Sequence, residues 1–149
     1  RRIMDICVDF DGTCVTHEFP KVGKDIGAVP ILKKLINNGH RLILFTMRSH
    51  LKEGTANPNS LGWKNSDKIE LETDVLQDAI DWFKQNNIPL YGINVNPSQL
   101  NWTKSPKAYG QLYIDDAALG CPLKFTELSS RPYVDWEKVD KLLTGDLYE

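Results

Sequence analysis

The sequence lacks the long apolar runs and the paired cysteines that define membrane and disulfide-rich proteins. No apolar stretch approaches the ~18 residues of a membrane-spanning helix. The first residues are not typical of a signal peptide, because an acidic residue soon follows the two arginines. The three cysteines, Cys7, Cys14 and Cys121, are an odd number without metal-ligand spacing. They favour free thiols, so we expect a cytoplasmic protein that does not associate with membranes.

An excess of one charge sign is also absent. The chain has 18 basic and 20 acidic residues and a formal net charge of −2, which argues against general nucleic-acid binding. Apolar residues make up 41% and charged residues 26%, as in ordinary globular proteins. A length of 149 residues matches one domain, so we expect residues 1–149 to form a single unit.

Short apolar runs alternate with helical patterns along the chain. Apolar runs predict strands, and a spacing of three or four residues between apolar positions predicts helices. The expected strands are 3–9, 41–45, 90–95 and 111–115, and the expected helices are 26–36, 71–86 and one that begins after Asp135. This alternation predicts an α/β fold, a Rossmann-like three-layer sandwich with a largely parallel sheet covered on both faces.

Polar residues follow the expected strands where each strand ends. In α/β sheets, ligands bind beyond the carboxyl ends of the strands, so these residues predict a site. They are Asp9 and Asp11, Thr46, Asn94 and Asn96, and Asp115 and Asp116.

This set of side chains suits phosphoryl transfer. Gathered carboxylates repel one another, and Mg²⁺, a hard cation with oxygen ligands, relieves that repulsion while bridging to a phosphate. A hydroxyl at Thr46, the N–H groups after it and a lysine can hold the other phosphate oxygens. One aspartate can attack phosphorus, and a second can exchange protons with the leaving group and water.

Four motifs in this order resemble those of the haloacid-dehalogenase (HAD) superfamily of phosphohydrolases. The first is Asp9-Phe10-Asp11-Gly12-Thr13, and the second is Leu44-Phe45-Thr46. The third is Lys107, and the fourth is Tyr113-Ile114-Asp115-Asp116. The motifs span residues 9–116, which is most of the chain.

The resemblance implies a Mg²⁺-dependent phosphatase that forms an aspartyl phosphate. Asp9 would be the nucleophile and a metal ligand. Asp11 would be the general acid and base, and its backbone carbonyl would be another metal ligand. Thr46 and the backbone N–H of Met47 would bind phosphate.

The resemblance leaves two assignments open. Lys107 is the expected phosphate-binding lysine, with Lys104 as its rival because Pro106 can redirect the loop. Asp116 is the favoured direct metal ligand, with Asp115 in support.

The intervals between motifs are too short for the full cap domain found in many members. Residues 14–28 have room only for a small flap, and residues 48–68 form a long, locally basic loop that we expect to line an open site. Arg48 and His50 in this loop are candidate substrate contacts. Such a site suits a phosphorylated small molecule or a phosphorylated macromolecule.

Other functions use similar residues. A phosphotransferase shares the chemistry, a receiver domain of a signalling protein also forms an aspartyl phosphate, and a non-catalytic domain could bind phospholigands. Asp11 argues against a receiver, because a nearby acid and base would shorten the life of the phosphoaspartate. Cys14 and His17 form a C-x-x-H pair, but a zinc site needs about two more ligands and none has the spacing. The residues indicate neither the substrate nor the oligomeric state.

Overall fold

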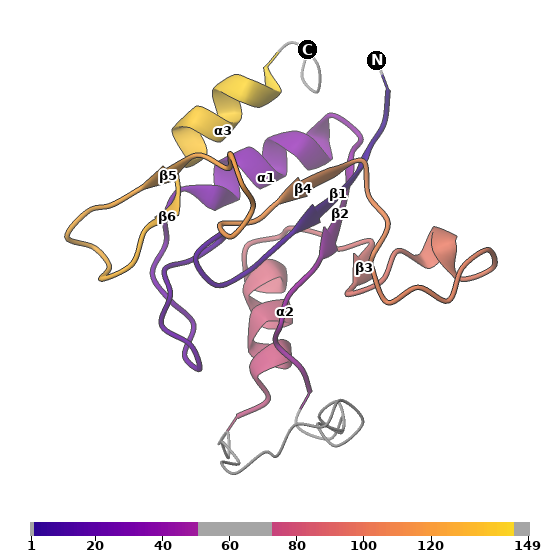
Figure 1. Ribbon diagram of the computed structural model, residues 1–149, viewed down its shortest axis with the longest axis horizontal. Helices are drawn as coiled ribbons and strands as arrows, with labels where there is room; N and C mark the ends of the chain where they lie inside the picture. Colours follow the sequence, from indigo (N-terminus) through magenta and orange to yellow (C-terminus); the bar gives the residue numbers. More distant parts are fainter. Residues whose placement is uncertain (1, 51–72, 145–149) are drawn as a thin grey trace.

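The computed structural model of the protein describes residues 2–50 and 73–144 (Figure 1). The strands are β1 (Asp5–Val8), β2 (Arg41–Leu44), β3 (Gly92–Ile93), β4 (Leu112–Ile114), β5 (Leu123–Lys124) and β6 (Tyr133–Val134). The helices are α1 (Ala28–Asn37), α2 (Val75–Gln85) and α3 (Trp136–Leu143), with a 3₁₀ turn, η2 (Pro97–Gln99).

The main sheet has four parallel strands in the order β3-β2-β1-β4, and β5 and β6 form a separate antiparallel pair. Val8 of β1 lies opposite Leu44 of β2 and Ile114 of β4, which sets the register of the three longer strands. The expected α/β fold with a largely parallel sheet is confirmed. β3 is shorter than the expected 90–95 strand, since Asn94 after it adopts a positive φ of 57°.

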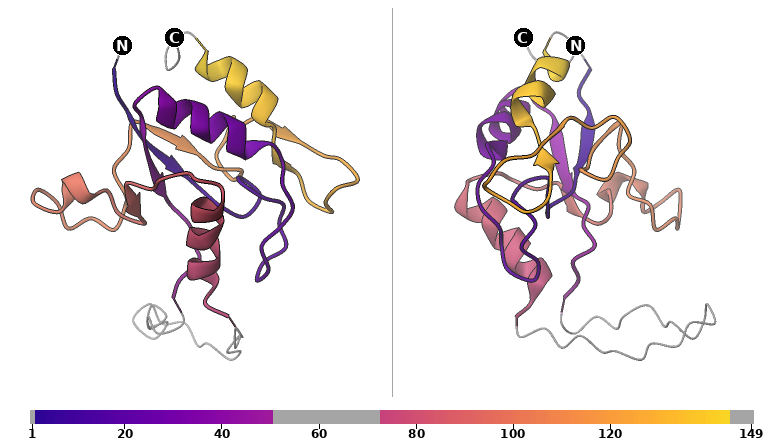
Figure 2. Two further views of the ribbon diagram at one scale, coloured as in Figure 1. Left: turned by 180° about the vertical axis from the view of Figure 1, so that it is seen from behind. Right: turned by 60° about the vertical axis from the view of Figure 1, so that its left-hand side comes forward.

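The helices cover one face of the sheet. The chain moves in one direction from β1 to β2 to β3, so right-handed crossovers place α1 and α2 on the same face. The return to β4 runs over the opposite face through residues 94–111, which contain only η2 (Figure 2). α3 packs beside α1, with Lys34 Nζ 3.1 Å from Asp140 Oδ1. The expected three-layer sandwich has helices on both faces of the sheet. In the described ranges no α-helix covers the second face, so that part of the expectation is not confirmed.

Alternating side chains of β1 divide the interior into two parts. Ile6 and Val8 point toward the helices and pack in one core with Leu32 and Phe83. Cys7 points to the other face and packs with Ala108 of the return segment. Each fully buried Leu, Ile or Phe stabilises the fold by roughly 1.5–3 kcal/mol, so the helix face supplies most of the stability.

The helix ends follow the chemistry of their residues. Pro30 lies in the first turn of α1, where its missing N–H costs little, and Gly39 takes a φ of +90° just after the helix. Asp74 caps α2 through the Gln77 N–H, and Asp135 caps α3 through the Lys138 N–H at 3.3 Å. The cap at Asp135 confirms the expected start of the last helix. α2 begins later than expected, and residues 71 and 72 lie outside the described residues.

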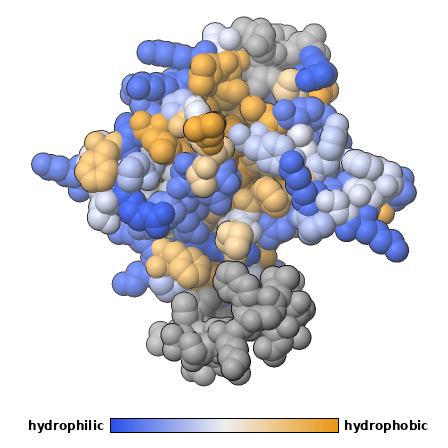
Figure 3. Space-filling view, in the orientation of Figure 1, coloured by the Kyte–Doolittle hydropathy of each residue, from blue (hydrophilic) through white to orange (hydrophobic). Residues whose placement is uncertain are grey.

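Apolar side chains also reach the surface. On the face in Figure 3, apolar residues gather over the middle and upper part of the described chain, with hydrophilic residues around them. Leu119, Phe125 and Leu128, before and within the β5–β6 hairpin, are among the exposed large hydrophobic residues. None of the helices in the described part of the chain has the length and apolar character needed to cross a membrane.

Candidate active site

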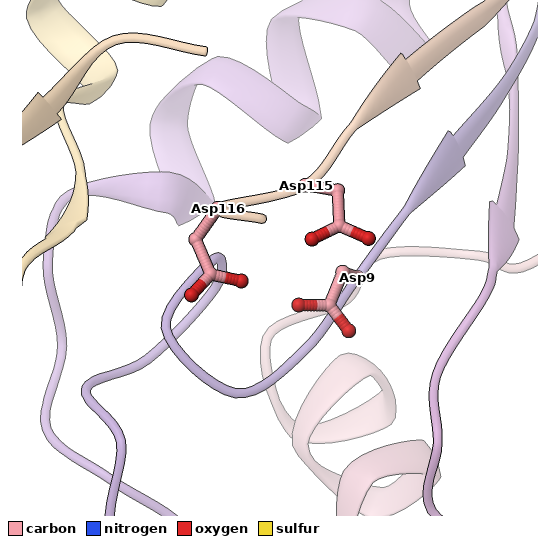
Figure 4. A group of neighbouring side chains, drawn as sticks. All are labelled: Asp9, Asp115 and Asp116. Atoms are coloured by element: carbon pink, nitrogen blue, oxygen red, sulfur yellow. The ribbon is translucent and has the colours of Figure 1, made fainter. Parts of the chain in front are cut away.

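Three carboxylates meet at the carboxyl ends of the two neighbouring strands β1 and β4. The direction of the chain across the sheet reverses between these strands, and such a point is where α/β folds bind ligands. Asp9 follows β1, and its N–H donates to Ile114 O at 3.0 Å, which continues the pairing with β4. Asp115 and Asp116 follow β4, and one oxygen from each of the three carboxylates lies within 4.8 Å of the others (Figure 4).

The Thr13 hydroxyl joins the turn after Asp9 to Asp116. Thr13 Oγ1 lies 2.9 Å from Asp9 Oδ2 and 3.2 Å from Asp116 Oδ1, and it accepts the Asp116 N–H at 3.0 Å. Trp136 of α3 donates its indole N–H to Thr13 O at 2.7 Å. Gly12 has a φ of +81°, and a Cβ there would collide with His17 and Asp116, so the turn requires glycine. The Gly-Thr sequence thus brings the two strand ends together.

The carboxylates differ in their affinity for protons. Burial, the negative charge of Asp115 and a hydrogen bond with Asp116 raise the pKa of Asp9 to about 8. Burial also acts to raise the pKa of Asp116, but hydrogen bonds with His17 and Asp9 outweigh it and lower that pKa. Asp9 therefore keeps its proton to a higher pH than Asp116 does.

This donor set fits a divalent cation. The three side chains offer only oxygen ligands, which Mg²⁺ prefers, and a cation would relieve the repulsion between their negative charges. Both oxygens of Asp116 already have partners, Thr13 and His17, the latter at 2.7 Å. One oxygen of Asp115 accepts the Ala117 N–H, and its carboxylate faces that of Asp9 (Figure 4).

The residues after β2 present groups that can bind an oxyanion. Asn94 Oδ1 accepts the Thr46 N–H at 2.8 Å, and Thr46 Oγ1 accepts the Arg48 N–H at 3.1 Å. The Thr46 hydroxyl proton stays available, and the Met47 N–H donates to none of the other described residues. Thr46 and Met47 line the same cavity as Asp9.

Arg48 lies inside the protein and binds the second aspartate of the first motif. Its guanidinium donates to both carboxylate oxygens of Asp11, at 2.8 and 2.7 Å, and its side chain is only 1% exposed. It also donates to the carbonyls of Val75 and Lys21, each at 2.9 Å. Arg48 thus ties the first motif to the start of α2, and because it also lines the cavity, its expected contact with substrate stays a prediction.

The structure does not bring Lys107 or Lys104 into the cavity with Asp9. Lys107 lines a separate hollow of about 370 Å³ on the return segment, where its ammonium lies 5.3 Å from the centre of the Tyr113 ring. Lys104 is exposed and lines neither space. His50 also lies outside the cavity lining, and its Nδ1 is 2.9 Å from Asp74 Oδ2 at the start of α2.

The segment expected as a flap folds back on itself beside the cavity. Thr16 and Lys24 pair through two hydrogen bonds, Thr16 N–H to Lys24 O at 3.0 Å and Lys24 N–H to Thr16 Oγ1 at 2.8 Å. His17 and Phe19 from this segment line the cavity. Residues 51–72 of the expected 48–68 loop lie outside the described residues.

The cavity has a volume of about 380 Å³. Seven of the expected site residues line it: Asp9, Asp11, Thr46, Met47, Arg48, Asp115 and Asp116. The other lining residues, His17, Phe19, Ala117 and Arg131, were not expected from the sequence. His17 was noted in the sequence only as half of the C-x-x-H pair, which was judged not to bind zinc. Arg131 lies in the β5–β6 hairpin, and no pattern linked that hairpin to the strand ends.

Comparison with known proteins gives one structural relative. No protein-family model matches the sequence, and no curated protein matches it. A solved structure from Bacteroides thetaiotaomicron, described as a conserved protein, is similar to this chain with 28% sequence identity and a TM-score of 0.64. The match covers 95% of this chain and 90% of that one. The similarity therefore covers nearly the whole chain. The description of that structure names no activity.

Proposed function

We propose that the protein is a Mg²⁺-dependent phosphohydrolase of the HAD type, acting on a phosphorylated substrate in the cytoplasm. The observation that carries the proposal is the meeting of Asp9, Asp115 and Asp116 beside Thr46 and the unpartnered Met47 N–H. Carboxylates that favour a cation and donors that favour an oxyanion thus line one cavity. The three free cysteines agree with a reducing compartment.

In this proposal Asp9 is the nucleophile. A carboxylate oxygen of Asp9 attacks phosphorus, the ester P–O bond breaks, and the leaving oxygen takes a proton from Asp11. Water then attacks the aspartyl phosphate, gives a proton to Asp11, and the bond from Asp9 to phosphorus breaks to release inorganic phosphate. The Thr46 hydroxyl and the Met47 N–H hold the phosphoryl oxygens through both steps. Bound Mg²⁺ would neutralise negative charge on the phosphoryl group.

Proton transfer through Asp11 needs a change in its partners. Both of its oxygens accept hydrogen bonds from Arg48 in this structure, so neither oxygen is free to contact a leaving group. One oxygen must leave Arg48 before Asp11 can carry a proton to a leaving group. Arg48 is therefore a positioning residue that holds the Asp11 carboxylate at the wall of the cavity.

Asp9 and Asp115 are the best placed direct ligands for Mg²⁺. Sequence reasoning favoured Asp116, but its oxygens contact Thr13 and His17. In this assignment Asp116 positions Thr13 of the turn and His17 of the flap through its two hydrogen bonds. Calorimetric titration with Mg²⁺ tests this assignment: Asp115→Asn should weaken binding more than Asp116→Asn, and the opposite order would restore the choice of Asp116.

A screen of phosphorylated metabolites with and without Mg²⁺ tests the function. Released phosphate should depend on Mg²⁺, disappear with excess chelator and return when the metal is restored. Asp11→Asn should lower turnover by ~10²–10⁴, the usual range for general acid–base catalysis. Asp9→Asn is the control for contaminating phosphatases, and full activity in this variant would overturn the proposal.

A further inference from the structure

We propose that Arg131 binds a second anionic group on the substrate, so that the site selects organic phosphates whose leaving group carries a carboxylate. This inference rests on the proposed function, because it assumes that a phosphoryl group lies between Asp9 and Thr46. Arg131 reaches the cavity from the β5–β6 hairpin, away from the four sequence motifs.

Among the described residues that line the cavity, Arg131 is the cation without a protein partner. Of the described arginine, lysine and histidine residues, those that line the cavity are His17, Arg48 and Arg131. His17 is bound to Asp116 at 2.7 Å, and Arg48 is bound to Asp11 at 2.7 Å. The Arg131 guanidinium makes no ion pair or hydrogen bond to another described residue. It can therefore bind a ligand without breaking an internal contact.

The hairpin that carries Arg131 is anchored to the rest of the molecule. Leu123 pairs with Val134 across β5 and β6, and the hydroxyls of Thr126 and Tyr133 lie 2.7 Å apart. Lys24 in the flap donates to Leu128 O at 3.1 Å. These contacts fix the base and the side of the hairpin, and the exposed Arg131 reaches the cavity from the loop between its two strands.

The phosphoryl group does not need Arg131. Its oxygens have the Thr46 hydroxyl, the Met47 N–H and the cation held by the carboxylates. A cavity of about 380 Å³ is larger than a phosphoryl group requires and lies within the range of sites for small organic ligands. Four aspartates line this cavity, so an additional anionic group is repelled unless a cation receives it. A guanidinium suits a carboxylate because it can donate two parallel hydrogen bonds.

Binding of two phosphonates tests the inference. Ethylphosphonate carries a phosphonate group only, and phosphonoacetate carries a carboxylate in addition. Their affinities therefore compare a ligand with one anionic group and a ligand with two. With Mg²⁺ present, calorimetry should show that the wild-type protein binds phosphonoacetate about tenfold more tightly or better, the value of one charge-assisted hydrogen bond. Arg131→Met should remove that preference and leave the affinity for ethylphosphonate unchanged, and Arg131→Lys should restore part of it.

Lys124→Met is the matched control. Lys124 lies on the same hairpin, with its ammonium 5.9 Å from the centre of the Tyr133 ring, and does not line the cavity. The substitution therefore removes one positive charge without changing the site. It should keep the preference for phosphonoacetate. An equal loss of affinity for both phosphonates in Arg131→Met would place Arg131 on the phosphoryl group instead and overturn the inference. An unchanged preference in that variant would also overturn it.

The same experiment separates this inference from the proposed function. If the wild-type protein binds neither phosphonate, the phosphate-binding assignment fails, and the inference fails with it. If the wild-type protein binds both phosphonates with equal affinity, only the role of Arg131 fails.

Discussion

Asp9 shows how much a single side chain depends on its neighbours. Its carboxyl group is partly buried beside two other carboxylates, and these surroundings, led by burial, raise its pKa to about 8. The same surroundings support the proposed role of Asp9 as a metal ligand, since a cation would remove the repulsion. The Asp-x-Asp-Gly-Thr motif allowed this group to be predicted, because glycine and threonine are the residues that the turn requires.

The ion pair between Arg48 and Asp11 leads to a prediction about stability. Arg48→Met should lower the free energy of unfolding by about 3 kcal/mol or more, because it leaves a mostly buried carboxylate and several carbonyls without their donor. Urea unfolding followed by circular dichroism measures this loss. The double variant with Asp11→Asn should be less destabilised than the sum of the two single variants. A loss below about 1 kcal/mol would mean that Arg48 acts as an exposed residue.

The three thiols should differ in reactivity. Burial raises the pKa of all three thiols, to about 11 for Cys7 and well above its usual value for Cys14, but Cys121 alone among them is partly exposed. Since only the thiolate reacts, Ellman's reagent at neutral pH should modify Cys121 first and Cys7 and Cys14 only after unfolding. Cys121→Ser identifies the fast thiol. Rapid reaction of all three thiols in the native protein would contradict the described packing.

At the scale of elements, periodicity predicted most helices and strands but not the arrangement of the layers. The expected helix 26–36 lies close to the bounds of α1, and Asp135 marked the start of α3. The placement of α1 and α2 on one face follows from the strand order β3-β2-β1-β4, which depends on long-range pairing. No local pattern contains that order, so a three-layer sandwich could not be distinguished from helices on one face.

The cap of α3 leads to a prediction for this element. Asp135→Ala should lower the free energy of unfolding by about 1 kcal/mol, because the Lys138 N–H loses its acceptor. Trp136 of the same helix donates to Thr13 O, so the loosened helix should also weaken Mg²⁺ binding. Urea unfolding and Mg²⁺ titration of one preparation give both values. Asp135→Asn should retain most of the cap, and equal losses in both variants would assign the effect to another contact.

At the scale of the whole molecule, the fold gathers strand ends from distant parts of the chain, and the sequence predicted only the groups with a recognisable motif. Asp9, Thr46 and Asp116 lie where their motifs placed them, at one cavity. Lys107 does not, because the path of residues 94–111 over the second face depends on packing against Cys7 and Tyr113. No sequence pattern placed Arg131 at the cavity, because it reaches the cavity through the tertiary position of a short hairpin.

The central claim is that Asp9 receives the phosphoryl group in a Mg²⁺-dependent reaction. The most direct measurement is mass spectrometry of the protein, acid-quenched during turnover of the best substrate from the phosphate screen and then digested into peptides. The account predicts one phosphoryl group on the peptide that contains Asp9, present with Mg²⁺ and absent with chelator or in Asp9→Asn. A phosphoryl group on another residue, or turnover in Asp9→Asn, would contradict it.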